Sequence, residues 1–346
     1  EALRAAHPGR PILLTCMTPT GRATAEALYG HFARIVYLPY DYAVLVRRFL
    51  RRARPAVGIL METELWPNLI RAADKQGVPL MLANARLSER SARGYARLPA
   101  LTRASLGRIT EIAAQTGADA TRLQRLGAHG IQIAGNLKFD ITPPPEMLER
   151  GAAWRAAWGN RPVLLAASTR EGEEALLLQA FAEAAPAAVL LVLVPRHPQR
   201  FDAVAGLIEA AGLPYGRRST NVPPDADTRV LLGDSLGELF AYYAACDVAF
   251  VGGSLLPLGG QNLIEAASVG KPVLIGPHTF NFEAATHEAI EAGAALRVND
   301  AAACMREAMK LLNEAPSCAA MGAAGRAFTA RHRGAAVRMA ARVPGL

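Results

Sequence analysis

The sequence has 346 residues, which favours two domains over one, and its 51% hydrophobic content indicates well-buried folded domains rather than a disordered or fibrous chain. No apolar run approaches the ~20 residues of a membrane-spanning helix, and no signal-peptide pattern is present. The net charge of +8 comes almost wholly from arginine, so a compositional bias toward that residue is enough to explain its size.

Apolar runs of strand length alternate with helix-like segments along the whole chain. The runs in the first half cover residues 12–15, 35–38, 57–61, 80–83, 111–114 and 131–134. Those in the second half cover residues 163–166, 189–194, 230–232, 248–251, 273–275 and 295–298. This alternation predicts an α/β protein with two doubly wound parallel sheets, followed by amphipathic helices over about 301–312 and 316–342.

The three prolines at 143–145 indicate a linker, so we expect an N-terminal domain over residues 1–140 and a C-terminal domain over 141–346. The chain starts at Glu1 in a stretch typical of the end of a helix, and we expect a further segment upstream of it. The four cysteines have no metal-binding or redox spacing, which indicates reduced thiols in a cytosolic compartment: Cys16, Cys246, Cys304 and Cys318.

Arginines gather in two segments of the first half, over residues 47–54 and 86–108, with few acids between them. Such a surface attracts phosphates or an anionic membrane leaflet. A plain solvated face is the alternative. Within the second segment, Arg86 and Arg90 follow the strand at 80–83, where they either grip an anionic acceptor or belong to a flexible basic loop.

Two glutamates, Glu62 and Glu64, come directly after the strand predicted at 57–61. In extended geometry, residues two apart point the same way, and the carboxyl ends of parallel strands are where open α/β sheets bind ligands. Glu64 has a second interpretation, as a favourable charge at the start of the helix that Pro67 begins. Glu62, nearer the strand, is the better candidate for a functional carboxylate.

The segment from Gly252 to Phe282 is the most informative part of the chain. The strand at 248–251 ends in Gly252, Gly253 and Ser254, and a later glycine pair opens a helix that carries Asn262 and Glu265. These two residues share a helix face, where the carboxylate can accept both hydroxyls of a ribose. A helix N-terminus also attracts an anion. The segment therefore predicts a site for a phosphorylated nucleoside, with His278 either a hydrogen-bonding residue of that site or a turn histidine.

Three other strand ends of the second half carry polar residues. Ser168 ends the strand near 163–166, although helix capping alone would explain it. Pro195 and Arg196 end the next strand, and an arginine there can pair with a phosphate. The helix start at 235–238 offers free amides and a tight glycine that can hold the edge of a base.

The position of these signals separates classes of two-domain α/β protein. A dinucleotide-binding fold requires G-x-G-x-x-G after its first strand, but CMTPTGRA and STREGEE occupy the corresponding places here, and no P-loop sequence is present. The nucleotide signature lies late in the second half instead. That placement favours a glycosyltransferase whose donor binds the C-terminal domain.

Several of these segments together resemble the 3-deoxy-D-manno-octulosonic acid (Kdo) transferases of lipopolysaccharide biosynthesis. The matching strings, in chain order, are TCMTPTGRATAE, ETELWPNLI, NARLSERS, GNLKFD, AASTREGEE, LVPRHPQRF, GDSLGELFAYY and FVGGSLLPLGGQNLIEAASVGKPVLIGPHTFNF. The resemblance implies a GT-B fold, with two Rossmann-like domains facing a central cleft. It also implies inverting transfer of Kdo from CMP-Kdo to a lipid A precursor (lipid IVA), without metal, cofactor or nucleic acid, by an enzyme peripheral to the cytoplasmic face of the inner membrane.

The resemblance also assigns roles to residues of this sequence. Donor (CMP) contacts fall on Pro195, Arg196, Leu236, Gly237, Glu238, Asn262, Leu263, Ile264 and Glu265. Residues expected to line the same cleft are Ser168, Gly252, Gly253, Ser254 and His278. Glu62 matches an acidic position that we assign to positioning the acceptor or the oxocarbenium-like sugar, and Arg86 and Arg90 are acceptor candidates. The general-base glutamate of the family is expected upstream of residue 1.

Two alternatives follow from these residues. One is another GT-B enzyme, such as a UDP-sugar transferase or epimerase, whose diphosphate donor requires a second cation. The other is a nucleotide- or lipid A-binding fragment that has lost catalysis. With the base upstream, we expect the chain as given to bind CMP but to transfer Kdo poorly.

Overall fold

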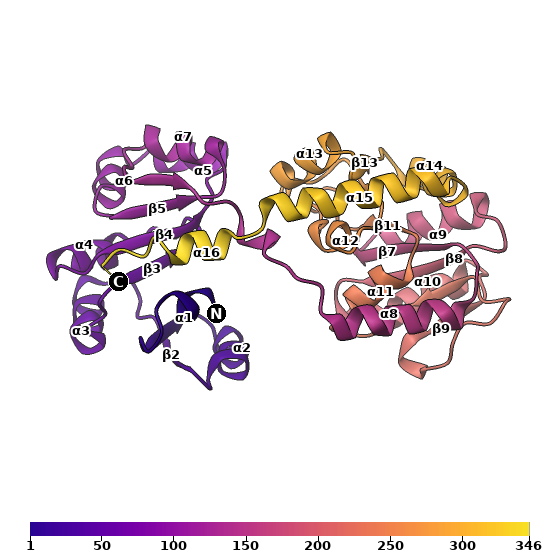
Figure 1. The fold of residues 1–346 in the computed structure, drawn as a ribbon, viewed down its shortest axis with the longest axis horizontal. Coiled ribbons are helices and arrows are strands. Elements are labelled where there is room, and N and C mark those ends of the chain that lie inside the picture. Colours follow the sequence, from indigo (N-terminus) through magenta and orange to yellow (C-terminus); the bar gives the residue numbers. More distant parts are fainter. Residues whose placement is uncertain (346) are drawn as a thin grey trace. The chain divides into compact units, whose positions relative to one another are not determined.

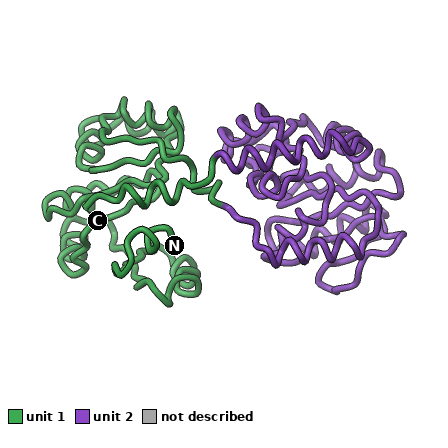
Figure 2. The backbone as a smooth tube through the Cα atoms, viewed as in Figure 1, with its two compact units in different colours: residues 1–140, 332–346 green, residues 141–331 purple. Residues whose placement is uncertain are grey.

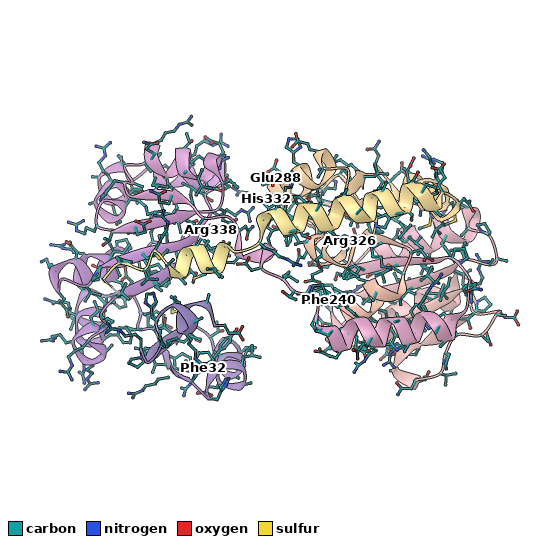
Figure 3. The ribbon with its side chains drawn as sticks, in the orientation of Figure 1. Phe32, Phe240, Glu288, Arg326, His332 and Arg338 are labelled. Atoms are coloured by element: carbon teal, nitrogen blue, oxygen red, sulfur yellow. The ribbon has the colours of Figure 1, made fainter. Side chains whose placement is uncertain are left out.

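The structure is a computed structural model that describes residues 1–345, and the chain forms two compact units (Figure 2). Unit 1 contains Glu1–Asp140 and the C-terminal residues from His332, and unit 2 contains Ile141–Arg331. The boundary after Asp140 falls just before the three prolines at 143–145, which lie at the start of unit 2, where Pro145 begins α8 (Pro145–Trp158). The last residues differ from the expected division because they pack with the N-terminal unit.

Unit 1 holds six strands and the helices that connect them (Figure 1). In chain order its elements are α1 (Ala2–Ala6), β1 (Ile12–Cys16), α2 (Pro19–Tyr29), β2 (Ala33–Tyr37), α3 (Ala43–Ala53), β3 (Gly58–Met61), α4 (Pro67–Lys75), β4 (Leu80–Ala85), α5 (Glu89–Tyr95), α6 (Pro99–Leu106), β5 (Glu111–Ala114), α7 (Gly117–Arg125), β6 (Ile131–Ile133), the 3₁₀ turn η1 (Leu137–Phe139) and α16 (Ala335–Ala340).

The strands of unit 1 form two parallel sheets rather than the single sheet expected. β3, β4, β5 and β6 pair in that order, whereas β1 pairs only with β2, from Ile12 opposite Ala33 to Cys16 opposite Tyr37. The small pair has its own apolar cluster, built on Ala25, Ala33 and Ile35. Periodicity locates a strand but does not say which neighbour it pairs with, which is why the division into two sheets was not predicted.

Unit 2 is a Rossmann-like unit with a seven-stranded parallel sheet in the order β13-β12-β11-β7-β8-β10-β9. Its elements are α8 (Pro145–Trp158), β7 (Val163–Thr169), α9 (Glu173–Ala184), β8 (Leu190–Pro195), η2 (Pro198–Arg200), α10 (Phe201–Ala210), β9 (Tyr215–Arg217), η3 (Arg218–Thr220), β10 (Val230–Leu232), α11 (Leu239–Ala245), β11 (Val248–Val251), α12 (Ile264–Val269), β12 (Val273–Ile275), α13 (Glu283–Glu291), β13 (Ala295–Arg297), α14 (Ala301–Asn313) and α15 (Ala315–His332).

The twelve predicted strands all overlap observed ones, and β9 was missed. Its three residues, Tyr-Gly-Arg, are half-buried at the edge of the sheet and form no apolar run. In the middle of the sheet, every residue of β7 and β8 is buried, as expected for strands covered by helices on both faces. This packing fixes the strand ends where the candidate site residues lie.

The helix predicted over 316–342 is divided by Gly334, which adopts φ +89° between α15 and α16. The Asp140 carboxylate accepts hydrogen bonds from the amides of Gly334, Ala335 and Ala336, at 2.5, 3.2 and 2.5 Å. Met339 packs in the same apolar cluster as residues of β4. These contacts explain why the C-terminal helix belongs to unit 1.

The four cysteines are free thiols, and burial raises the pKa of Cys246 to about 12. Within residues 1–345, no helix has both the length and the apolar character needed to cross a bilayer.

Candidate active site

The pair predicted to hold a ribose lies at the start of α12. The Asn262 side-chain amide donates to Oε1 of Glu265 at 3.0 Å, while its carbonyl oxygen accepts from the amide of Ile264 at 3.1 Å. Burial raises the pKa of Glu265, and both the Asn262 hydrogen bond and the positive charge of Arg196 oppose that rise. Oε2 of Glu265 has no partner within residues 1–345, so it is available to a ligand hydroxyl. Leu263 and Ile264 are fully buried and can offer a ligand only their backbone.

The glycine loop after β11 (residues 252–255) is hydrogen-bonded to the start of α9, after β7, by a carboxylate that the sequence analysis did not single out. Glu173 is fully buried and accepts from the amides of Gly253, Ser254 and Leu255 at 2.6–2.9 Å. It also accepts from the amide of Arg170 at 2.9 Å. The amides of residues 253–255 are therefore occupied internally. The only sequence signal for this role was the position of Glu173 directly after a glycine, at the start of a helix.

Two residues of the glycine loop have structural roles. A Cβ on Gly252 would lie 2.6 Å from Cα of Thr169, so no larger residue fits there. Ser254 is fully buried, donates to the carbonyl of Val251 at 2.6 Å and accepts from the amide of Gly276 at 2.9 Å. Its side chain supports the loop from inside, which differs from the expected place lining the site.

The next loop, around His278, is held at its backbone. Arg297 donates to the carbonyls of Gly276 and Pro277 at 3.0 and 3.1 Å, and the amide of His278 donates to the carbonyl of Ser254 at 3.0 Å. The His278 side chain is half-buried. It remains a candidate ligand contact.

The ends of β7 and β8 place Ser168 and Arg196 close together. Ser168 is buried in the left-handed conformation at φ +56°, and the amide of Arg196 donates to the carbonyl of Thr169 at 2.9 Å. Pro195 is buried, whereas the Arg196 side chain is exposed. Since the charge of Arg196 acts on Glu265, the residue predicted to bind a phosphate and the residue predicted to bind a ribose lie near each other at this edge of the sheet.

The loop before α11, predicted to hold a base, is built around a buried carboxylate. Leu236 is 70% exposed and Gly237 has φ +77°, so this turn presents backbone groups and one apolar side chain to the surface. Oε1 of Glu238 accepts from Arg150 at 2.8 Å and from Arg218 at 3.0 Å. Its Oε2 is buried without a hydrogen-bond partner. The two arginines lie far from residue 238 in sequence and were not predicted.

In unit 1, the carboxyl ends of the larger sheet bring together an acid and two basic residues. Glu62 follows β3 at φ +57°, with an exposed side chain and its amide bonded to the carbonyl of Ala83 at 2.8 Å. Burial lowers the pKa of Lys138, the charge of Arg86 lowers it further, and the charge of Glu62 opposes both. The three groups are therefore within electrostatic reach of one another. Lys138 was not singled out from the sequence, although this residue lies in the string GNLKFD.

The remaining predicted residues of unit 1 are Arg90 and Glu64. Arg90 is exposed on α5, and its side chain forms no ion pair with any residue the structure describes. Trp66 donates to Oε2 of Glu64 at 3.4 Å, which agrees with a local role for Glu64 at the start of α4. The turn that carries Lys138 is fixed from β4, because the buried Asn84 accepts from the amide of Leu137 at 3.1 Å.

Comparison with solved structures identifies the fold as GT-B, the architecture of many glycosyltransferases and sugar-nucleotide epimerases. Anabaena HepE in complex with UDP and glucose aligns at a TM-score of 0.62, with 14% identity over 97% of this chain and 91% of that one. A Neisseria meningitidis UDP-GlcNAc 2-epimerase aligns at 0.59, with 16% identity over 93% and 91%. At these identities the likeness concerns the fold alone.

The chain belongs to the 3-deoxy-D-manno-octulosonic acid transferase family and is thus a glycosyltransferase. A Bordetella pertussis transferase of that name is 48% identical over 95% of this chain and 79% of its own length, and a Haemophilus influenzae one is 39% identical over 96% and 79%. The family model described as 3-deoxy-D-manno-octulosonic-acid transferase matches residues 1–141. The crystal structure of the C-terminal CMP-Kdo binding domain of WaaA from Acinetobacter baumannii is 34% identical, covers 53% of this chain and 97% of its own, and has a TM-score of 0.51.

Proposed function

We propose that this Kdo transferase takes its sugar from CMP-Kdo and transfers it to a lipid A precursor such as lipid IVA, with inversion and without a metal. The observation that carries the donor assignment is the group formed by Arg196, Asn262 and Glu265, which lies in a unit 34% identical to a CMP-Kdo binding domain. Glu265 would accept the ribose hydroxyls and Arg196 would bind the single phosphate. The turn at Leu236 and Gly237 would present backbone groups to the cytosine.

The group in unit 1 suits an anionic acceptor. Glu62 would position the acceptor hydroxyl or stabilise positive charge that develops on the sugar. Arg86 and Lys138 would bind an acceptor phosphate, since both are cationic and lie within reach of Glu62. The acceptor hydroxyl is a weak nucleophile near neutral pH, and a positioned general base typically raises the rate of such a transfer about 10²–10⁴-fold.

We also propose that the protein associates peripherally with the anionic cytoplasmic face of the inner membrane. All five arginines of the segment 47–54 are exposed. A cavity of about 420 Å³ beside α3 is lined by apolar residues that include Leu13 and Phe49, and by Arg34, Arg48 and Arg52. Tyr40 and Tyr42, just before α3, are 73% and 68% exposed. Basic and aromatic side chains around an apolar groove favour contact with anionic lipid.

The reaction is tested by incubating the protein with CMP-Kdo and lipid IVA and following formation of the Kdo-bearing lipid and release of CMP. Calorimetric titration with CMP and with UMP separates a cytidine donor from a uridine donor. Preference for UMP, or CMP binding without any transfer by the chain joined to the upstream segment of a relative, would contradict the proposal. Attachment to anionic vesicles should weaken as salt rises, and binding that ignores salt would point to an apolar contact alone.

A further inference from the structure

Two arginines without an ion pair follow neighbouring strands of unit 2. β7 and β8 pair with Thr169 opposite Pro195, and the next residues are Arg170 and Arg196. The amide of Arg196 donates to the carbonyl of Thr169 at 2.9 Å, so the two chains leave the sheet side by side. Within residues 1–345, neither guanidinium has a hydrogen bond or an ion pair with another side chain.

A third arginine, Arg200, follows the same strand end but differs from these two because carboxylates of unit 2 pair with it. Arg200 has a side chain only 17% exposed and is paired with Glu174 at 3.1 Å and with Glu171 at 3.6 Å. Its charge is therefore balanced within unit 2. The charges of Arg170 and Arg196 are not balanced in this way.

The charges that act on His197 indicate that these three arginines lie near one another. Burial lowers the pKa of His197, and the charges of Arg170, Arg196 and Arg200 lower it further. All three guanidiniums are therefore within electrostatic reach of one imidazole. Of the two fully buried carboxylates of this segment, Glu173 is occupied by backbone amides and Glu174 is paired with Arg200.

Arg170 is also well positioned. Its amide donates to Oε2 of Glu173 at 2.9 Å, and the same oxygen accepts from Gly253. The backbone of Arg170 is thus fixed to the glycine loop, and its side chain is half-buried. A half-buried arginine on a fixed backbone loses less freedom when it binds a carboxylate than one on a mobile loop does, which favours binding.

The donor named in the proposed function, on which this inference rests, has two anionic groups. Its phosphate is bonded through oxygen to the anomeric carbon, and the sugar carboxylate is bonded to the same carbon. Two cations a short distance apart would match these two anionic groups. We propose that Arg170 binds the carboxylate of the activated sugar acid while Arg196 binds the phosphate.

This division of roles makes Arg170 a specificity-determining residue. It selects an activated sugar acid over an activated neutral sugar, because a donor without the carboxylate leaves the half-buried guanidinium without a partner. The planar guanidinium offers two parallel N–H groups to a carboxylate, which lysine does not. The Arg170 side chain therefore discriminates among sugars, whereas Arg196 and Glu265 recognise the nucleotide.

The test compares Arg170→Gln and Arg170→Lys with Arg196→Gln in the full chain, using calorimetric titration with three ligands. CMP lacks the carboxylate, and CMP-Kdo carries it. In the C1 methyl ester of CMP-Kdo the carboxylate is replaced by a neutral ester of similar shape. Arg306→Gln, on the exposed face of α14, is the matched control for loss of one positive charge. Circular dichroism and the melting temperature establish that each variant is folded.

We expect Arg170→Gln to weaken CMP-Kdo binding about ten- to hundredfold and to leave CMP binding unchanged. The methyl ester should bind the variant and the unaltered chain with the same affinity. Arg170→Lys should recover part of the affinity, and Arg196→Gln should weaken all three ligands. Equal losses for CMP and CMP-Kdo in Arg170→Gln would overturn the inference, as would no loss for either. If the unaltered chain bound no CMP, the proposed donor itself would fail, which is a different result.

Discussion

Removing the Glu265 carboxylate should weaken nucleotide binding without unfolding unit 2. Its Oε1 is held by Asn262 at 3.0 Å, and Oε2 is left for the ribose. Hydrogen bonds to a charged group contribute about 1.5–3 kcal/mol, so Glu265→Ala should raise the Kd for CMP roughly ten- to hundredfold. The fold should survive, because burial raises the pKa of Glu265 and its charge is therefore not stabilised by the folded protein.

The direction of that pKa shift gives a second measurement on the same residue. Since the pKa lies above that of an ordinary glutamate, Glu265 gains its proton at a higher pH than usual as the solution is acidified. A protonated carboxyl accepts hydrogen bonds less well, so CMP affinity should fall on acidification earlier than an ordinary glutamate would cause. The free energy of unfolding depends on pH in the opposite direction to CMP affinity. Glu265 favours the folded state at low pH, and that contribution is lost as pH rises through the raised pKa.

The assay is calorimetric titration with CMP across pH, for the unaltered chain, Glu265→Ala and Glu265→Gln, with Glu149→Ala on α8 as a control for loss of one exposed carboxylate. Glu265→Gln removes the titration of the carboxylate, so any pH dependence of CMP affinity that is left in this variant comes from the CMP phosphate. Unchanged CMP affinity in both variants at all pH values would refute the ribose assignment.

Three further changes follow from the same contacts. Glu173→Gln replaces an acceptor of four amides by a group that also donates, so we expect a loss of about 2–4 kcal/mol and a melting temperature lower by roughly 5–15 °C, measured by calorimetry. An unchanged melting temperature would show that the loops do not depend on it. Asp140→Ala removes the hydrogen bonds to α16 and should lower turnover with unchanged CMP affinity, whereas a change in CMP affinity would contradict a role confined to unit 1. Lys138→Met should raise the KM for lipid IVA more than that for CMP-Kdo, and the converse would place Lys138 at the donor. Turnover of the unaltered chain should decline at a lower alkaline pH than an ordinary lysine causes, because the pKa of Lys138 is lowered by burial and by Arg86.

The sequence was most informative where a residue acts through its own position along a strand or helix. The spacing of Asn262 and Glu265 predicted that the two residues share a helix face. α12 begins only at Ile264, so Asn262 precedes the helix, but its side chain still donates to Glu265. Glu62 followed a strand that was easy to recognise. In each case the relevant geometry is local, so periodicity and turn chemistry were enough to find it.

The residues that were missed act through contacts between distant segments. Arg150 and Arg218 bind Glu238 from 88 and 20 residues away, and Glu173 reaches a loop 80 residues further along the chain. No pattern within a window of one helix or strand contains such a contact. The same reason explains why the two sheets of unit 1 and the place of α16 were not predicted. Those features depend on which surfaces meet, and apolar periodicity identifies only which surfaces are apolar.

Contacts of this kind also affect how the excess positive charge of the chain is balanced at its surface. Several acids of this chain are used inside it: Asp41 accepts from the start of α4, Asp140 from the start of α16, and Glu173 from the glycine loop. Loops that follow parallel strands leave backbone amides without partners, and a carboxylate from another segment satisfies several at once. The chain has 30 acidic residues against 38 basic ones. Because internal amides occupy part of the smaller set, fewer carboxylates are left to balance the arginines at the surface. An excess of exposed guanidinium groups is what an enzyme needs if its donor, its acceptor and the surface it works on are all anionic, so the arginine bias and the proposed function have a common physical basis.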